Sequence, residues 1–175
     1  ELPCGSGLGG GSSDAAAVLR GLCHATNTPL ESLSSDFLAR IGADVPVCFH
    51  ALPCLMEGIG EILSPWSMDD TDAVLVWPGP GGSTQALYQA WDETPVPYDG
   101  GNDFQPLAAR FCPGVDDALA ALNAFPGCRM ARLSGSGTAV FGLFDTLPSI
   151  ENLEFPWVQP CRIGTLKKPL VTPLG

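Results

Sequence analysis

Hydrophobic residues near the start of the chain recur with the period of an α-helix. They stand at i, i+3, i+4 and i+7, namely Ala15, Val18, Leu19 and Leu22. This spacing predicts a helix over residues 12–23, with Ser12 or Ser13 as its N-cap. A second set of apolar residues also shares one helical face, namely Leu33, Phe37, Leu38 and Ile41. This set predicts a helix over residues 30–41, ended by Gly42.

The two expected helices are joined by a short polar loop, so they should pack antiparallel. At about 11 residues and about 1.5 Å per residue, each would be about 16 Å long. The end of the second helix would then return to the start of the first. Asp44, in the sequence G-A-D-V-P, is therefore expected near the residues that precede the first helix.

The remainder of the chain mixes short apolar segments with amphipathic ones. Strands or extended segments are expected over residues 45–55, 73–77, 129–133, 138–144 and 156–164, and a turn leads into a strand over residues 56–63. Helices are expected over residues 85–91, capped by Ser83 or Thr84, and over residues 102–111, 115–123 and 150–153. The polar segment 64–72 is a candidate boundary between two subdomains. This intermixing predicts an α+β fold with mostly antiparallel sheet.

A glycine-rich stretch, P-C-G-S-G-L-G-G-G-S-S-D-A-A-A, precedes and enters the first helix. Five of seven successive positions in it are glycine, namely Gly5, Gly7, Gly9, Gly10 and Gly11. Glycine lets a ligand approach the main chain closely, and a helix start presents free N–H groups and the positive end of the helix dipole. Because such a loop binds phosphate, we predict a nucleotide phosphate site here.

A dinucleotide site, a Walker A loop and a structural turn each fit this stretch less well. Its first glycines satisfy the dinucleotide fingerprint G-x-G-x-x-G, but residues 1–4, which include Pro3, make a poor buried strand before it. The Walker A pattern fails because no lysine follows the last glycine. A purely structural turn rarely needs so many glycines.

Composition narrows the classes of partner. The net charge is −11, the pI is about 4.3 and only eight residues are basic, which argues against nucleic acid. Backbone amides must therefore hold most of any phosphorylated ligand. Hydrophobic residues make up 45% of the chain and are too dispersed to predict a membrane span. Seven cysteines without a C-x-x-C pair favour reduced thiols in a cytoplasmic protein over a disulfide framework or a zinc site.

Three further features are each compatible with two roles. Asp44 is either a solvated or capping carboxylate, or a base that accepts the proton of a hydroxyl attacking a phosphoryl group. The turn S-G-S-G over residues 134–137 is either a plain hairpin or a second nest of backbone amides. Tyr88 lies on a helical face, where a core position is commoner than a ligand contact.

The glycine-rich stretch resembles the ATP-phosphate loop of the GHMP small-molecule kinases. Further matches are G-A-D-V-P-V-C, M-E-G-I-G-E-I-L, G-G-N-D-F and L-S-G-S-G-T-A-V-F-G-L-F. Together they are similar to the branch that phosphorylates a cytidine diphosphate-linked methylerythritol in the non-mevalonate isoprenoid pathway. The resemblance runs from Pro3 to about Pro160. It implies a two-subdomain α+β architecture, with the remainder of an N-terminal, ATP-binding subdomain at residues 1–66 and the C-terminal subdomain at residues 67–175.

The resemblance also implies roles for individual residues. The ATP-binding loop would comprise Pro3, Gly5, Gly7, Leu8, Gly9, Gly10, Gly11, Ser12 and Ser13. Asp44 would be the general base that activates the substrate hydroxyl at C2. The substrate side would be formed by Thr84, Tyr88, Gly135, Ser136 and Gly137, with the ring of Tyr88 stacked on the cytosine. ATP would carry Mg²⁺ with it, and no residue is assigned as a metal ligand.

One departure from the family is large. The family's N-terminal portion supplies a catalytic lysine that no residue of this chain matches, since Lys167 and Lys168 stand at the wrong end. We therefore expect the chain to be the later part of a longer protein and to show little activity by itself. Two alternatives stay open: another GHMP kinase, of the homoserine or mevalonate type, and a non-catalytic module that binds anions or another partner.

Overall fold

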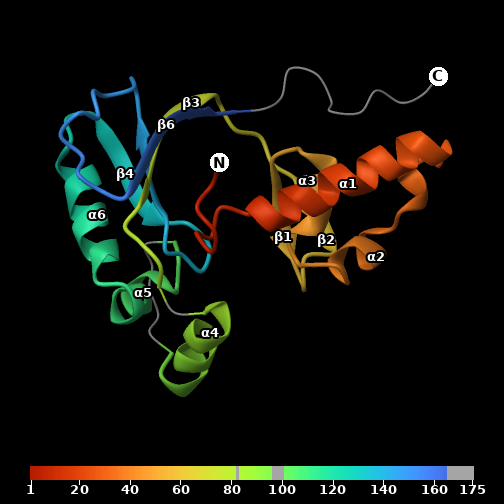
Figure 1. The fold of residues 1–175 in the computed structure, drawn as a ribbon, viewed down its shortest axis with the longest axis horizontal. Coiled ribbons are helices and arrows are strands. Elements are labelled where there is room, and N and C mark those ends of the chain that lie inside the picture. The colour runs from red at the N-terminus through yellow and green to blue at the C-terminus, as the bar shows by residue number, and fades with distance from the viewer. Residues whose placement is uncertain (82, 96–100, 165–175) are drawn as a thin grey trace. The chain divides into compact units, whose positions relative to one another are not determined.

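The computed structural model describes residues 1–81, 83–95 and 101–164 (Figure 1). Lys167 and Lys168 lie outside the described residues. The chain divides into two compact units, each described by itself below. The first unit is formed by Glu1–Leu8 together with Thr71–Ile163, and the second chiefly by Gly9–Asp70. The glycine-rich stretch therefore passes from one unit to the other between Leu8 and Gly9.

The unit Gly9–Asp70 is built from short helices and one β-hairpin. Its elements are α1 (Gly10–Thr26), the 3₁₀ helix η1 (Leu30–Ser32), α2 (Ser35–Ala39), α3 (Val45–His50), β1 (Cys54–Glu57) and β2 (Ile62–Pro65). The strands β1 and β2 pair antiparallel, and α1 packs against α3. A small apolar core lies between the helices, formed by the buried residues Ala16, Leu38, Val45 and Phe49.

The first helix begins earlier than the apolar pattern predicts. Its N-cap is Gly9, in the left-handed conformation with φ of 69° and with no side-chain cap. Ser12 and Ser13 therefore lie inside the first turn, and the prediction that one of them caps the helix is wrong. Because Gly9 can adopt the left-handed conformation, the helix begins directly after it, upstream of both serines.

The second predicted helix is divided into two short pieces. Leu33 is extended, with φ of −88° and ψ of 107°. Ser34 then starts α2 afresh, because its Oγ accepts a hydrogen bond from the N–H of Phe37 at 3.2 Å. The N-cap preference of serine thus outweighs the apolar periodicity of residues 30–41.

The segment predicted as a strand over residues 45–55 is a helix in its first half. Pro46 lies in the first turn of α3, where the missing N–H of proline removes no helical hydrogen bond. Ala51 ends α3 with a φ of 53°, and the strand β1 begins only at Cys54. Pro46 had favoured an edge strand in the sequence, whereas here it marks a helix start.

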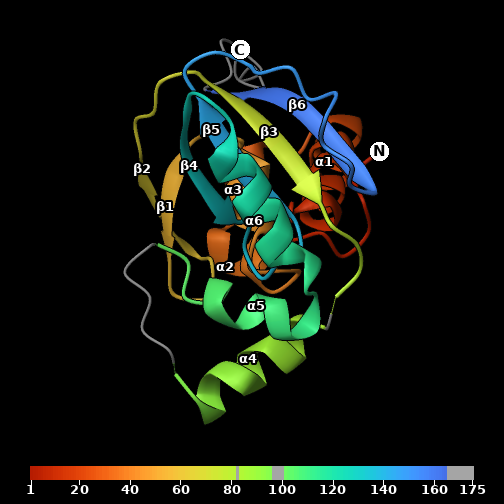
Figure 2. The same cartoon turned by 90° about the vertical axis from the view of Figure 1, so that its left-hand side faces the viewer.

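The other unit is an antiparallel sheet with helices. The sheet has the order β4-β5-β3-β6, formed by β4 (Cys128–Leu133), β5 (Val140–Phe144), β3 (Thr71–Trp77) and β6 (Trp157–Ile163). Its helices are α4 (Thr84–Glu93), α5 (Gln105–Phe111) and α6 (Gly114–Ala124). Figure 2 shows α6 lying across one face of this sheet. The core between them contains Val74, Val76, Val115, Leu122, Leu133, Val140 and Phe144.

The sequence predicts this unit well. The side chain of Ser83 caps α4 by accepting from the N–H of Ala86 at 3.1 Å, as expected. The predicted α+β class with antiparallel sheet is confirmed. Residues 150–153 form only a turn, with the N–H of Leu153 donating to Ile150 O at 3.0 Å. The short segment between Pro148 and Pro156 is too brief for a stable helix. Across the described residues, helices that combine the length and the apolarity needed to cross a bilayer are absent.

Candidate active site

The start of the glycine-rich stretch is tied to the S-G-S-G turn within one unit. Ser6 is only 4% exposed, and its carbonyl accepts a hydrogen bond from the N–H of Ala139 at 2.9 Å. The carbonyl of Gly7 accepts from Ser134 Oγ, also at 2.9 Å. Ser134 begins the S-G-S-G turn and Ala139 lies two residues after it, and the Ser134 N–H donates to Ala139 O at 2.9 Å. Segments more than 120 positions apart in sequence are thereby joined.

Gly7 is the residue that makes this close approach possible. Its φ is 76°, in the left-handed region that disfavours side chains. A Cβ at this position would overlap the carbonyl of Ser134 and would lie 2.8 Å from Gly137 O and 2.9 Å from Gly137 N. Any larger residue would therefore push the two loops apart.

The second half of the glycine-rich stretch forms the start of α1. The first hydrogen bond of this helix runs from the N–H of Ser13 to Gly9 O at 2.9 Å. The N–H groups of Gly10, Gly11 and Ser12 precede it, and first-turn N–H groups have no intrahelical acceptor. Together with the positive end of the dipole of a 17-residue helix, they form a place suited to an anion.

The structure brings the segment before Asp44 beside this helix start, as the hairpin geometry predicts. A Cβ built on Gly42 would lie 4.0 Å from Ser12 Oγ, and Ser13 Oγ donates to Cys48 Sγ at 3.6 Å. Asp44 occupies the N-cap position of α3, yet its side chain makes no capping hydrogen bond. Its carboxylate is exposed, so it is accessible to a substrate.

Two features that the sequence reasoning missed hold the segment of Asp44 in place. On one side, Arg20 of α1 donates through Nη1 to Cys48 O at 2.8 Å and to Phe49 O at 3.0 Å. These carbonyls lie at the C-terminal end of α3, where a cation is favourable. The sequence signal for this contact was the position of Arg20, a basic residue next to Leu19 on the inward side of an amphipathic helix.

On the other side, the turn of the β1–β2 hairpin packs against the backbone before Asp44. Gly60 has a φ of 105°, and a Cβ there would overlap the carbonyl of Ala43, with the carbonyl carbon 2.8 Å away. The motifs M-E-G-I-G-E and G-A-D-V-P are therefore in direct contact.

Three of the expected substrate residues lie together in the first unit. Thr84 Oγ1 and Ser136 Oγ are 3.0 Å apart, within hydrogen-bond distance. Tyr88 stands one helical turn after Thr84 and is 52% exposed. Its ring meets that of Phe104 edge to face, with centroids 4.7 Å apart at 68°. The core position expected for Tyr88 from the residues alone is therefore wrong, and an exposed aromatic face is available.

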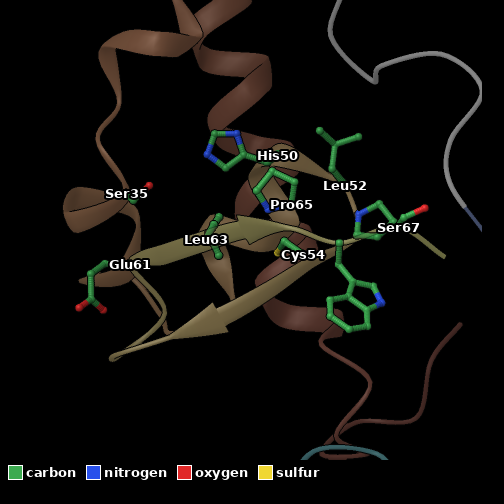
Figure 3. A pocket seen from close by; sticks show the side chains of 10 residues that line it. Ser35, His50, Leu52, Cys54, Glu61, Leu63, Pro65 and Ser67 are labelled. Carbon is green, nitrogen blue, oxygen red and sulfur yellow. The ribbon is translucent and has the colours of Figure 1, made fainter.

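A pocket of about 740 Å³ lies elsewhere, on the unit Gly9–Asp70. Figure 3 shows its lining from the β1–β2 hairpin, the end of α3 and the start of α2, with His50, Leu63 and Ser35 among the labelled side chains. The lining is mostly apolar, which does not suit a triphosphate. None of the expected site residues lines it.

The donors near the start of α1 suit the oxygens of a phosphate group. No group of three or more His, Cys, Asp or Glu side chains in the described part of the chain is arranged to hold a metal. The available donors are backbone N–H groups and the hydroxyls of Ser12 and Ser13, which contact phosphate oxygens well.

Two family models match the chain. A model described as the GHMP kinases N terminal domain matches residues 1–59, and one described as GHMP kinases C terminal matches residues 86–162. Both units thus carry the fold of the GHMP kinases.

Comparisons with individual proteins narrow the class. The 4-diphosphocytidyl-2-C-methyl-D-erythritol kinase of Cereibacter sphaeroides is 40% identical over 94% of this chain and 69% of its own length. That of Paracoccus denitrificans is 40% identical over 82% of this chain and 56% of its own length. A crystal structure of 4-(cytidine 5'-diphospho)-2C-methyl-D-erythritol kinase matches with a TM-score of 0.68 and 30% identity, over 83% of this chain and 59% of that one.

The chain belongs to the family of the 4-diphosphocytidyl-2-C-methyl-D-erythritol kinases within the GHMP kinases. It spans 56% to 69% of the length of the two curated relatives named above.

Proposed function

We propose that the complete protein containing this chain transfers the γ-phosphoryl group of ATP to the C2 hydroxyl of 4-diphosphocytidyl-2-C-methyl-D-erythritol in isoprenoid precursor biosynthesis, and that the chain by itself has little activity. The names of its relatives support this substrate. The observation that carries the proposal is that Asp44, at the start of α3, is exposed and that Gly42, two residues before it, lies beside Ser12 in the first turn of α1. A carboxylate next to an anion-binding helix start is the pairing that phosphoryl transfer to an alcohol requires.

In the proposed reaction the free N–H groups at the start of α1 hold the phosphates of ATP. The substrate oxygen forms a bond to the γ-phosphorus while the bond from that phosphorus to the β–γ bridging oxygen breaks, and ADP leaves. The proton of the hydroxyl passes to Asp44. Mg²⁺ bound to the nucleotide neutralises phosphate charge. The chain contributes position and fixed dipoles, and no covalent enzyme intermediate is needed.

Substrate roles are proposed for a second set of residues. The exposed ring of Tyr88 offers a face on which cytosine can stack, and its edge-to-face contact with Phe104 limits its motion. Thr84 and Ser136 supply hydroxyls at adjacent positions. Gly135 brings a backbone N–H group to the same turn, and Gly137 closes that turn by donating its N–H to Ser134 O at 2.9 Å. The compartment we propose is the cytoplasm, because all seven cysteines are free.

A phosphate-transfer assay tests the proposal. ATP labelled at the γ-phosphate would be incubated with the complete protein that contains this chain and, separately, with 4-diphosphocytidyl-2-C-methyl-D-erythritol, mevalonate and homoserine, because the chain by itself is expected to show little activity. We expect label in the first substrate only. Label in mevalonate or homoserine would assign a different GHMP kinase reaction. ATP binding by calorimetry without label in any acceptor would support a non-catalytic anion-binding module instead.

A further inference from the structure

Asn102 uses its whole side-chain amide within the unit that contains the S-G-S-G turn. Its Nδ2 donates to Leu133 O and to Gly135 O, both at 2.9 Å. Its Oδ1 accepts from the N–H of Phe104 at 3.0 Å. Asn102 stands shortly before α5 and is half-buried. Both amide hydrogens and the amide oxygen therefore have partners, which fixes the orientation of the side chain.

The two carbonyls that Asn102 holds flank Ser134, the residue that contacts the glycine-rich stretch. Ser134 Oγ donates to Gly7 O at 2.9 Å. The N–H of Leu133 is held as well, because it donates to Gln105 Oε1 at 2.9 Å. Asn102 and Gln105, near the start of α5, therefore hydrogen-bond the backbone directly before and after Ser134.

These contacts form one network. Hydrogen bonds join Phe104 to Asn102 and Asn102 to the carbonyls of Leu133 and Gly135, the backbone links those two residues to Ser134, and Ser134 is hydrogen-bonded to Gly7. A parallel bond joins Ala139 to Ser6. Hydrogen bonds in such a network support one another, and loss of one buried donor leaves its acceptors unpaired.

We propose that Asn102 is a positioning residue for the phosphate-binding loop. It fixes the turn around Ser134, and that turn fixes the backbone of Ser6 and Gly7. The role of the loop in holding ATP rests on the function proposed above. Asparagine suits the position because one end must donate to two carbonyls while the other accepts from an N–H. Aspartate has the same shape, but it would place an acceptor against Leu133 O and Gly135 O.

The test compares Asn102→Asp with Asn123→Asp, which makes the same chemical change at an exposed position of α6. Hydrogen exchange of the Gly137 and Ala139 amides and ATP affinity by calorimetry would be measured well below the melting temperature. For Asn102→Asp we expect faster exchange at both amides and an ATP Kd raised by about tenfold. In turnover, KM for ATP should rise more than kcat falls, because the contacts of Asn102 lead to Ser6 and Gly7 of the phosphate-binding loop. Asn123→Asp should match the unaltered protein.

Each outcome decides the inference. Unchanged exchange at Gly137 and Ala139 would overturn it, as would faster exchange with unchanged ATP affinity. An equal fall in kcat and in kcat/KM would also contradict a positioning role. If the unaltered protein did not bind ATP, the proposed function would fail, and exchange alone would decide whether Asn102 fixes the loop. Asn102→Ser, which is small and polar, would take the place of Asn102→Asp if that variant did not fold.

Discussion

Gly60 illustrates how a single residue can constrain a catalytic segment that it does not belong to. It lies in the turn between β1 and β2, and its Cα faces the backbone of Ala43. Both its φ of 105° and the lack of space exclude a side chain. Since Ala43 directly precedes Asp44, the position of the carboxylate depends on this glycine.

We expect Gly60→Ala to lower the free energy of unfolding by about 1–3 kcal/mol, because the new Cβ adds backbone strain and an overlap. Displacement of Ala43 should lower kcat as well. Urea unfolding and the transfer assay would measure both effects. The matched control is Gly21→Ala on α1, where a Cβ meets nothing within 4 Å. The control should be neutral or stabilising by up to about 1 kcal/mol, and equal effects of the two changes would contradict the contact.

Cys161 and Cys4 should differ in reactivity. Burial raises the pKa of the Cys161 thiol above its usual value, whereas Cys4 is exposed. Since the thiolate is the reactive form, iodoacetamide should alkylate Cys161 more slowly than Cys4 at about pH 8, as read by mass spectrometry. Equal labelling rates would show that Cys161 is not shielded.

The raised pKa of Cys161 also affects stability, because the folded state disfavours the thiolate. The folded state therefore loses stability relative to the unfolded chain as the pH rises past the ordinary thiol pKa.

At the scale of elements, the sequence predicted a helix or strand correctly where its capping residues, turn residues and apolar pattern all favoured the same structure. The Ser83 cap, β3 and the β4–β5 hairpin all follow from turn residues and apolar runs that point to one answer. The segment at residues 30–41 carried two signals, because its apolar period favoured one helix while Ser34 favoured a new start. Pro46 was ambiguous in itself, since proline is compatible both with an edge strand and with a first helical turn. Only packing of α3 on α1 decides this case.

The contact between α1 and α3 gives a prediction at this scale. Arg20→Met keeps much of the length of the side chain but loses the hydrogen bonds to Cys48 O and Phe49 O. We expect the free energy of unfolding to fall by about 1.5–3 kcal/mol, because charged donors make the stronger hydrogen bonds. Chemical denaturation would measure it. Arg40→Met removes an exposed arginine at the end of α2 and should change stability by less than about 0.5 kcal/mol. A similarly small effect for Arg20→Met would mean that Arg20 does not hold α3.

At the scale of the whole molecule, sequence motifs indicated the candidate site residues, but they did not indicate which other residues hold them in place. The glycine-rich stretch and Asp44 were singled out from their types and spacing, whereas the substrate roles of Thr84, Tyr88 and residues 135–137 came from the resemblance to the GHMP kinases. Their supports, which include Asn102 and Ser134, join positions 31 to 127 apart in the chain. Pairings over such separations depend on the folded path, and a single sequence carries no local signal for them.

The exposed apolar surface of the unit Gly9–Asp70 also escaped the sequence. Its pocket is lined by Leu52, Leu63, Pro65 and Trp66, among others, and Trp66 is 63% exposed. The sequence predicted an edge strand or extended segment over residues 45–55 and a turn leading into a strand over residues 56–63, without a pocket. Exposure of such residues becomes visible only when their neighbours are known.

The central claim is that Asp44 accepts the proton of the hydroxyl that attacks ATP, and Asp44→Asn tests it most directly. Turnover and ATP affinity would be measured on the same preparation of the complete protein that contains this chain, with Asp36→Asn, at an exposed position of α2, as the control. The account predicts that kcat falls by about 10²- to 10⁴-fold while the Kd for ATP stays nearly the same and the control is unaffected. Turnover by Asp44→Asn within about tenfold of the unaltered protein would contradict the assignment of this residue as the base.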